Sequence, residues 1–173
     1  MTTSAFFFLA VRALHVLLAA AWLGTVAFVY LVLSPALDEV GPSGAALMTA
    51  LARRGFHALI AAVGGTTVLT GLWLYWRFTG GFDPAASATM GTRVFGAGGV
   101  AGILALVIGG AIVGRTVKKL EALGAKVPAA SDAQRAALMA EIAATKKRLN
   151  IWGKIVLALQ VVALLCMAIG HYV

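Results

Sequence analysis

The fold of this chain is decided near its N-terminus by residues 5–33, which read AFFFLAVRALHVLLAAAWLGTVAFVYLVL. A helix of about 20 apolar residues crosses a hydrocarbon core of about 30 Å, so this run is long enough to span a membrane. It also contains two side chains that such a run rarely holds, Arg12 and His15. Ionisable groups are costly inside a bilayer, and His15 is therefore the best functional clue in the sequence.

The remaining sequence predicts a membrane protein built only from helices. Of the 173 residues, 61% are hydrophobic, compared with roughly half in soluble domains. No basic residue precedes the first run, so we interpret it as a retained span and not as a signal peptide. We expect an all-α, integral membrane four-helix transmembrane bundle that forms a single domain over residues 1–173. Its spans are predicted at about residues 5–33, 56–78, 94–114 and 151–173, with a cytoplasmic helical hairpin at about residues 115–150 that extends the third and fourth helices.

The distribution of charge predicts the orientation in the membrane. The formal net charge is +8, and eight of the 14 Lys and Arg residues lie between Arg115 and Arg148. Cytoplasmic connections carry an excess of basic residues, so the third connection is expected inside and both termini outside. This predicts a multi-pass protein of the plasma membrane (the inner membrane in a bacterium). Because topology explains the charge, no nucleic-acid partner is expected.

Proline, glycine and serine residues predict where the helices begin and end. We expect the first helix to end at Pro35, and a short interfacial helix with Ser43 as its N-cap to run to Arg54. The third helix is expected to stop at Gly124. Ser131 and Gln134 then have the spacing of a capping box, which opens a fourth helix of about 40 residues.

The third span is rich in glycine. Gly98 with Gly102, and Gly110 with Gly114, have the spacing that lets membrane helices approach closely. These glycines predict either close packing within the chain or a homodimer. The protruding hairpin, in turn, is expected either to pack on itself or to hold a partner in a larger membrane complex.

Depth in the bilayer decides which of the three histidines can act together. With Arg12 at the outer interface, His15 lies about one turn below it, and His171 ends the fourth span at a similar depth. His57 begins the second span at the opposite interface. His15 and His171 are therefore the predicted pair, and His57 is predicted to lie out of reach.

One imidazole from each of two helices is an arrangement that holds haem b within a bundle. Around this site we expect Trp22, two turns from His15, and Met167, one turn before His171, with Arg12 positioned to pair with a propionate. The alternative is copper, because His15, His171 and the soft thioether of Met167 form a ligand set suited to Cu(I). His15 and His171 are the candidate metal ligands in both cases.

Residues 12–37 resemble the first helix of the CopD-like family of small membrane proteins, in which a histidine, a Trp-x-Gly step and a closing Pro-Ala-Leu follow one another. Here these are His15, Trp22-Leu23-Gly24 and Pro35-Ala36-Leu37. The chain is similar, more distantly, to the HemJ-type protoporphyrinogen oxidases, which are four-helix haem b proteins. That likeness rests on Leu14-His15, Trp22 and the step Thr70-Gly71-Leu72-Trp73. The resemblance implies a haem-binding or copper-related membrane protein with His15 as a ligand.

Together these observations predict a membrane-embedded redox protein that binds haem b and exchanges electrons with a quinol, a porphyrin or a partner subunit. Two alternatives stay open at this point. One is a copper-handling membrane protein, and the other is a non-catalytic accessory subunit of a larger complex.

Overall fold

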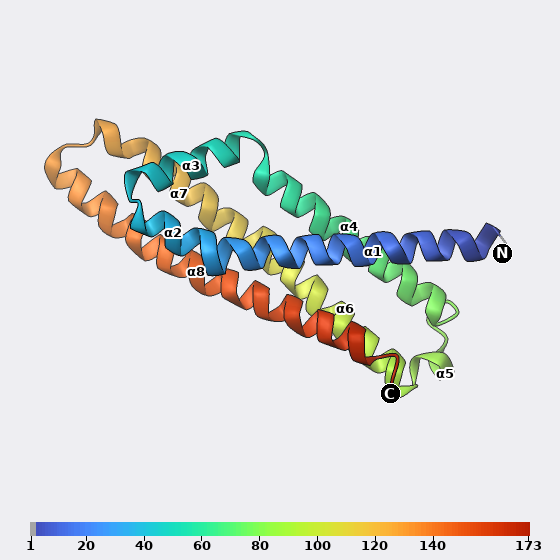
Figure 1. The fold of residues 1–173 in the computed structure, drawn as a ribbon. Coiled ribbons are helices and arrows are strands. Elements are labelled where there is room, and N and C mark those ends of the chain that lie inside the picture. The colour runs from blue at the N-terminus through green and yellow to red at the C-terminus, as the bar shows by residue number, and fades with distance from the viewer. Residues whose placement is uncertain (1–2) are drawn as a thin grey trace.

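The computed structural model describes residues 3–173 and is all-α (Figure 1). Within these residues, four helical stretches are long and apolar enough to cross a membrane, as predicted. They are α1 (Thr3–Phe28) continued by η1 (Val29–Leu33) and α2 (Ser34–Glu39); α4 (Phe56–Phe78); α6 (Met90–Ile108) continued by η2 (Gly109–Val113), α7 (Gly114–Lys126) and η3 (Val127–Ala129); and α8 (Asp132–Ile169). The shorter helices α3 (Pro42–Arg53) and α5 (Pro84–Ser87) lie in the connections.

The first helix does not end at Pro35, as the sequence predicted, but continues through it to Glu39. Proline has no N–H and its ring crowds the carbonyl four residues earlier. The turn before it widens to relieve this conflict: η1 is a π-helical turn in which the N–H of Ser34 donates to the carbonyl of Val29. The helix therefore accommodates the proline with a bulge, and the first stretch is longer than the expected span.

Two predicted helix boundaries were wrong by a few residues. Gly41, with φ of 58°, is the N-cap of α3, and Pro42 begins the helix, so Ser43 already lies inside it. Proline suits a first helical position because its missing N–H would have no partner there. The third helix also passes through Gly124 and continues to Lys126 before the turn at η3.

The hairpin of α7 and α8 has the predicted form. The N–H of Ser131 donates to Oε1 of Gln134 over 3.0 Å, which is one half of the expected capping box. From there α8 runs for 38 residues without interruption. The two helices pack against each other, and the ion pair between Lys119 Nζ and Glu141 Oε1, 2.7 Å apart, joins them.

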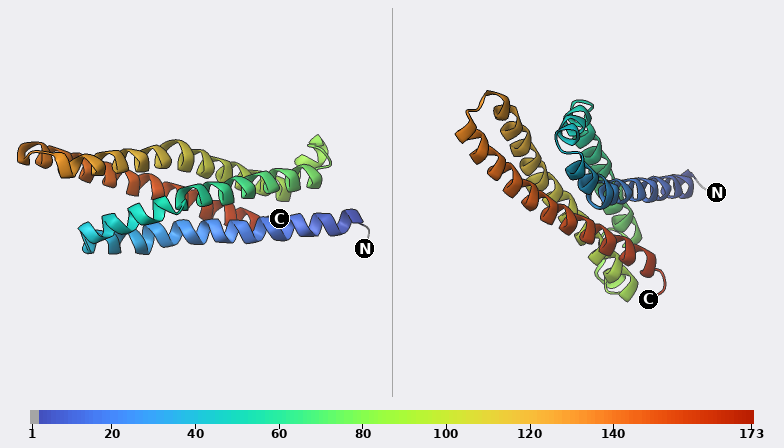
Figure 2. Two further views of the ribbon diagram at one scale, coloured as in Figure 1. Left: turned by 90° about the horizontal axis from the view of Figure 1, so that it is seen from above. Right: turned by 60° about the vertical axis from the view of Figure 1, so that its left-hand side comes forward.

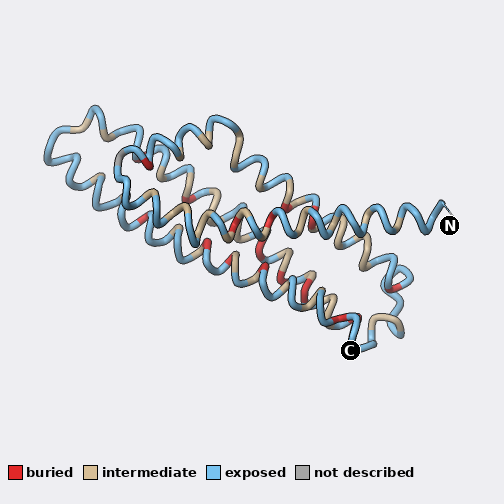
Figure 3. Tube along the Cα trace, viewed as in Figure 1, coloured by how far each residue is buried: buried red, intermediate tan, exposed pale blue. Residues whose placement is uncertain are grey.

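The four long helices pack unequally. α1 contacts mainly α4, α4 contacts α6, and α6 contacts α8 most extensively of all. α1 and α8 make far fewer contacts, and the N-terminal part of α1 diverges from α8 (Figure 2). The core is narrow and lies where the helices cross, around Trp22, Val26, Ala105 and Val156 (Figure 3).

Large apolar side chains cover most of the outer surface. Leu17 on α1 and Leu69 on α4 are each 68% exposed. A water-soluble protein rarely presents so much contiguous apolar surface, whereas spanning helices present it to lipid. The exposure pattern therefore agrees with a bundle whose outer faces contact a bilayer.

Close approach of α6 and α8 depends on particular glycines. A Cβ added at Gly98 would lie 2.8 Å from the Cβ of Cys166 on α8, so this position must stay small. At Gly102 and Gly110, by contrast, an added Cβ would meet no described atom within 4 Å beyond the adjacent backbone of its own helix. Of the two glycine pairs predicted to mediate packing, Gly98 thus packs within the chain, while Gly102 and Gly110 face open space.

Candidate functional site

His15 lies between α1 and α4 and is anchored to α4 through one ring nitrogen. Its Nδ1 is 2.9 Å from the main-chain carbonyl oxygen of Thr67 and 3.1 Å from Oγ1 of Thr70. A carbonyl oxygen only accepts, so Nδ1 carries the proton and donates. The other ring nitrogen, Nε2, is then the one with a lone pair, which is the form of histidine that binds a metal.

Thr70 strengthens this anchor because its own proton is used elsewhere. Its Oγ1 donates to the main-chain carbonyls of its own helix, at 2.7 Å from Thr66 O and 3.0 Å from Thr67 O. A lone pair of the hydroxyl therefore remains for the Nδ1–H of His15. Both contacts hold the imidazole in one tautomer and one orientation.

Gly71 allows the imidazole to lie directly against α4. A Cβ added at this glycine would lie 2.8 Å from Cε1 of His15 and 3.6 Å from its Nε2. Leu14-His15 and Thr70-Gly71 are separate parts of the resemblance to haem b proteins, and the fold brings His15 into contact with both Thr70 and Gly71.

Trp22, two turns after His15 on α1, also packs its ring against a glycine of α4. Its ring lies 2.7 Å from the position of a Cβ added at Gly64, and only 7% of the residue is exposed. His15 and Trp22 are seven residues apart, as are Gly71 and Gly64. Trp22, predicted to contact a cofactor, is thus placed in the core as a packing residue between α1 and α4.

His171 makes different contacts from His15. Its Nε2 accepts a hydrogen bond from Nη2 of Arg12 over 3.1 Å, and its ring meets Phe95 edge-on with the ring centroids 5.0 Å apart. The end of α8 therefore reaches the level of Arg12, in agreement with the depth argument. However, His15 turns towards α4 while His171 binds Arg12, and the structure does not direct the two imidazoles at a common point.

The remaining predicted residues lie apart from His15. The Cε of Met167 is 3.2 Å from the position of a Cβ added at Gly98, so the thioether packs on α6.

His57 is exposed at the first turn of α4, with its ring against Phe56. It precedes Thr70 by 13 residues, about 20 Å along a helix, and so lies out of reach of His15 as predicted. In residues 3–173, no three His, Cys, Asp or Glu side chains are grouped to hold a metal ion.

Gln160 is a buried polar residue for which the sequence predicts no role. It is only 5% exposed, and neither its Nε2 nor its Oε1 has a hydrogen-bond partner within the described part of the chain. It lies one turn after the core residue Val156 on α8. The sequence could have marked Gln160 as a candidate functional residue, because an apolar run such as Ile151 to Val173 rarely contains a polar side chain.

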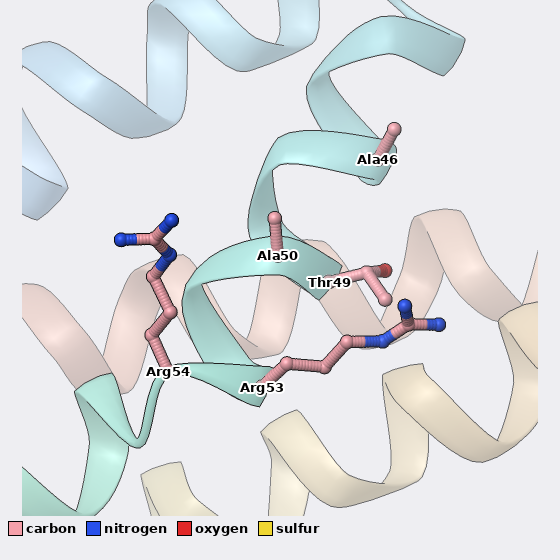
Figure 4. A pocket seen from close by; sticks show the side chains of 5 residues that line it. All are labelled: Ala46, Thr49, Ala50, Arg53 and Arg54. Carbon is pink, nitrogen blue, oxygen red and sulfur yellow. The ribbon is translucent and has the colours of Figure 1, made fainter.

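Two shallow hollows are found on the helix surfaces, and neither is lined by His15. One lies on α3 beside Ala46, Thr49 and Ala50, with Arg53 and Arg54 pointing to opposite sides of the helix (Figure 4). The other lies along α1 and includes Arg12.

Comparison of the chain with protein-family models, with curated proteins and with solved structures found no match. The functional interpretation therefore rests on the residues and their geometry.

Proposed function

We propose that this protein is a membrane-embedded redox protein that binds haem b through His15. The observation that carries the proposal is the bond between Nδ1 of His15 and the carbonyl of Thr67. Histidines that bind metals almost always donate their second ring N–H to a carbonyl, a carboxylate or water. This bond sets the tautomer and leaves Nε2 as the nitrogen that would bind iron.

The surroundings of His15 are also those of a residue that would hold haem iron. Gly71 leaves the edge of the ring free of a side chain from α4, and Thr70 restrains its rotation. Arg12 stands one turn before His15, but its guanidinium donates to Nε2 of His171, so we do not assign it to a haem propionate. When bound, haem b would supply one-electron redox chemistry, with a quinol, a porphyrin or a partner subunit as the candidate electron donor or acceptor.

His171 fits less well as a second ligand. Its Nε2 already accepts a hydrogen bond from Arg12, so binding iron through this atom would require that bond to break. We therefore propose His15 as the only protein ligand needed to retain the haem. Copper is less favoured than in the sequence argument, because Met167 packs against α6 and does not join the two imidazoles.

The proposed setting is the plasma membrane, with both termini outside and the α7–α8 hairpin in the cytoplasm. The position of the basic residues supports this orientation, since most lie on or next to the hairpin. In this orientation Arg12, His15 and His171 lie in the outer half of the bilayer, and His57 lies at the inner interface.

The proposal is tested by the absorption spectrum of the protein purified in detergent from haem-replete cells. We expect a Soret band that shifts when dithionite is added. His15→Ala is expected to lose most of the haem, whereas His57→Ala, the matched control, retains it. A colourless wild-type protein, or full haem content in His15→Ala, would overturn the assignment.

A further inference from the structure

Two basic side chains meet at the outer end of the bundle with no acid between them. Nη2 of Arg12 donates to Nε2 of His171, and both residues are exposed. A guanidinium has five N–H donors and cannot accept, so several donors of Arg12 remain after this bond. Because Nε2 of His171 is the acceptor, its Nδ1 carries the proton and is a further donor. The pair thus presents donors only.

No carboxylate side chain of residues 3–173 neutralises this pair. The ion pairs found there involve Lys119, Arg135 and Lys146, which belong to the hairpin end of the molecule. The connection between α4 and α6 contains one acid, Asp83, and its carboxylate caps α5 by accepting from the N–H of Ala86 over 2.9 Å. The outer end of the bundle therefore has unused positive charge.

A shallow apolar hollow on the outer face of α1 includes the same guanidinium. It is open on its outer side and is lined, besides Arg12, by Leu9, Ala13, Val16 and Leu17, all on α1. These residues recur at helical spacing on the lipid-facing side of α1, where Val16 and Leu17 are 57% and 68% exposed. Leu9 precedes Arg12 along the chain, whereas Ala13, Val16 and Leu17 follow it. In the proposed orientation the longer part of the hollow therefore runs from the charged pair towards the centre of the bilayer.

We propose that Arg12 and His171 bind the phosphate of an anionic phospholipid from the outer leaflet, with an acyl chain in the hollow along α1. Charge complementarity argues for an anion, and charge-assisted hydrogen bonds from a guanidinium suit phosphate oxygens. The apolar hollow argues for an amphiphile and against a free ion. The edge contact with Phe95 holds the His171 ring while Nδ1 donates. This inference rests on the proposed membrane placement and not on the proposed haem.

The test uses delipidated full-length protein in detergent, titrated with phosphatidylglycerol or with phosphatidylcholine and followed by native mass spectrometry. We expect tighter binding of phosphatidylglycerol, and a loss of about tenfold in its affinity in Arg12→Gln. Arg77→Gln, at the outer end of α4, is the matched control and should bind normally. Equal affinities for the two lipids, or equal losses in the two arginine variants, would overturn the proposal.

Two further arms separate the possible sources of the anion. Inorganic phosphate should not raise the melting temperature, because it cannot use the hollow, and Ala13→Phe should weaken phosphatidylglycerol binding by filling it. Stabilisation by inorganic phosphate equal to that by the lipid would contradict a lipid site. Binding is also measured in His15→Ala, where it should persist. Loss of lipid binding there would make the anion site dependent on the haem site, which contradicts the proposal but not the proposed function.

Discussion

The two sides of α1 are built in different ways. Against α4, His15 and Trp22 fit closely onto Gly71 and Gly64, with hydrogen bonds from the imidazole to the neighbouring helix. Against α8, the N-terminal half of α1 has the polar bridge from Arg12 to His171, between two exposed residues. A close helix contact can hold an imidazole in a fixed orientation, whereas a bridge between exposed side chains leaves room for an outside molecule. The same helix thus supports the proposed cofactor ligand on one side and the proposed lipid site on the other.

Enlarging Gly64 should break the α1–α4 contact most severely. In Gly64→Ala the new Cβ would approach the Trp22 ring to 2.7 Å, and the aromatic ring cannot move without disturbing the core. Overpacking of this kind costs about 1–3 kcal/mol. We expect a lower melting temperature in detergent. Gly65→Ala is the control because, beyond the adjacent backbone of its own helix, no described atom lies within 4 Å of its added Cβ. Equal melting temperatures for the two variants would show that the contact is not close.

Replacing Gln160 tests how completely α8 is packed near α1 and α6. Its amide is buried and has no hydrogen-bond partner within residues 3–173, and an unsatisfied amide costs about 1–3 kcal/mol. Gln160→Leu keeps a similar volume and removes that cost, so we expect a higher melting temperature. A clear decrease instead would reveal that the amide has a polar partner, such as an internal water or a bound molecule.

Removing the bridge between α1 and α8 should change stability only slightly. Arg12 and His171 are both exposed, and a single hydrogen bond contributes about 0.5–1.5 kcal/mol. Arg12→Gln in lipid-free detergent is therefore expected to melt close to the wild type and well above Gly64→Ala. A loss as large as that of Gly64→Ala would mean that the outer edge of α1 is held as firmly as its α4 side.

The smallest effect is expected at the hairpin end of the molecule, where Lys146 Nζ lies 3.0 Å from Oδ1 of Asp38 and joins α8 to α2. Both side chains are more than half exposed, and such pairs contribute about 0–1 kcal/mol. Lys146→Met should melt within a degree or two of the wild type, with a difference that shrinks further at high salt. A large, salt-independent loss would contradict the surface character of this pair.

The sequence predicted the number of spans, the position of α4 and the capped start of α8, because apolar runs and capping patterns are local signals. It did not predict the π-helical turn at Val29–Leu33, since a proline can end a helix or be absorbed by a bulge. The sequence also could not predict which helix the side chain of His15 contacts. Because α1 is apolar on all sides, hydrophobic periodicity does not indicate which face of α1 packs against α4. The contact with Gly71 depends on the register between two helices that are distant in sequence.

The central claim, that His15 is the haem ligand and not merely a packing residue, is tested most directly by rescue with free imidazole. His15→Gly leaves a space beside Gly71. Free imidazole can diffuse into this space and would bind the haem iron in place of the missing side chain. We predict that His15→Gly purifies with little haem, and that imidazole with added haem restores a Soret band that shifts on reduction. A folded His15→Gly protein that keeps its full haem content without imidazole would contradict the account.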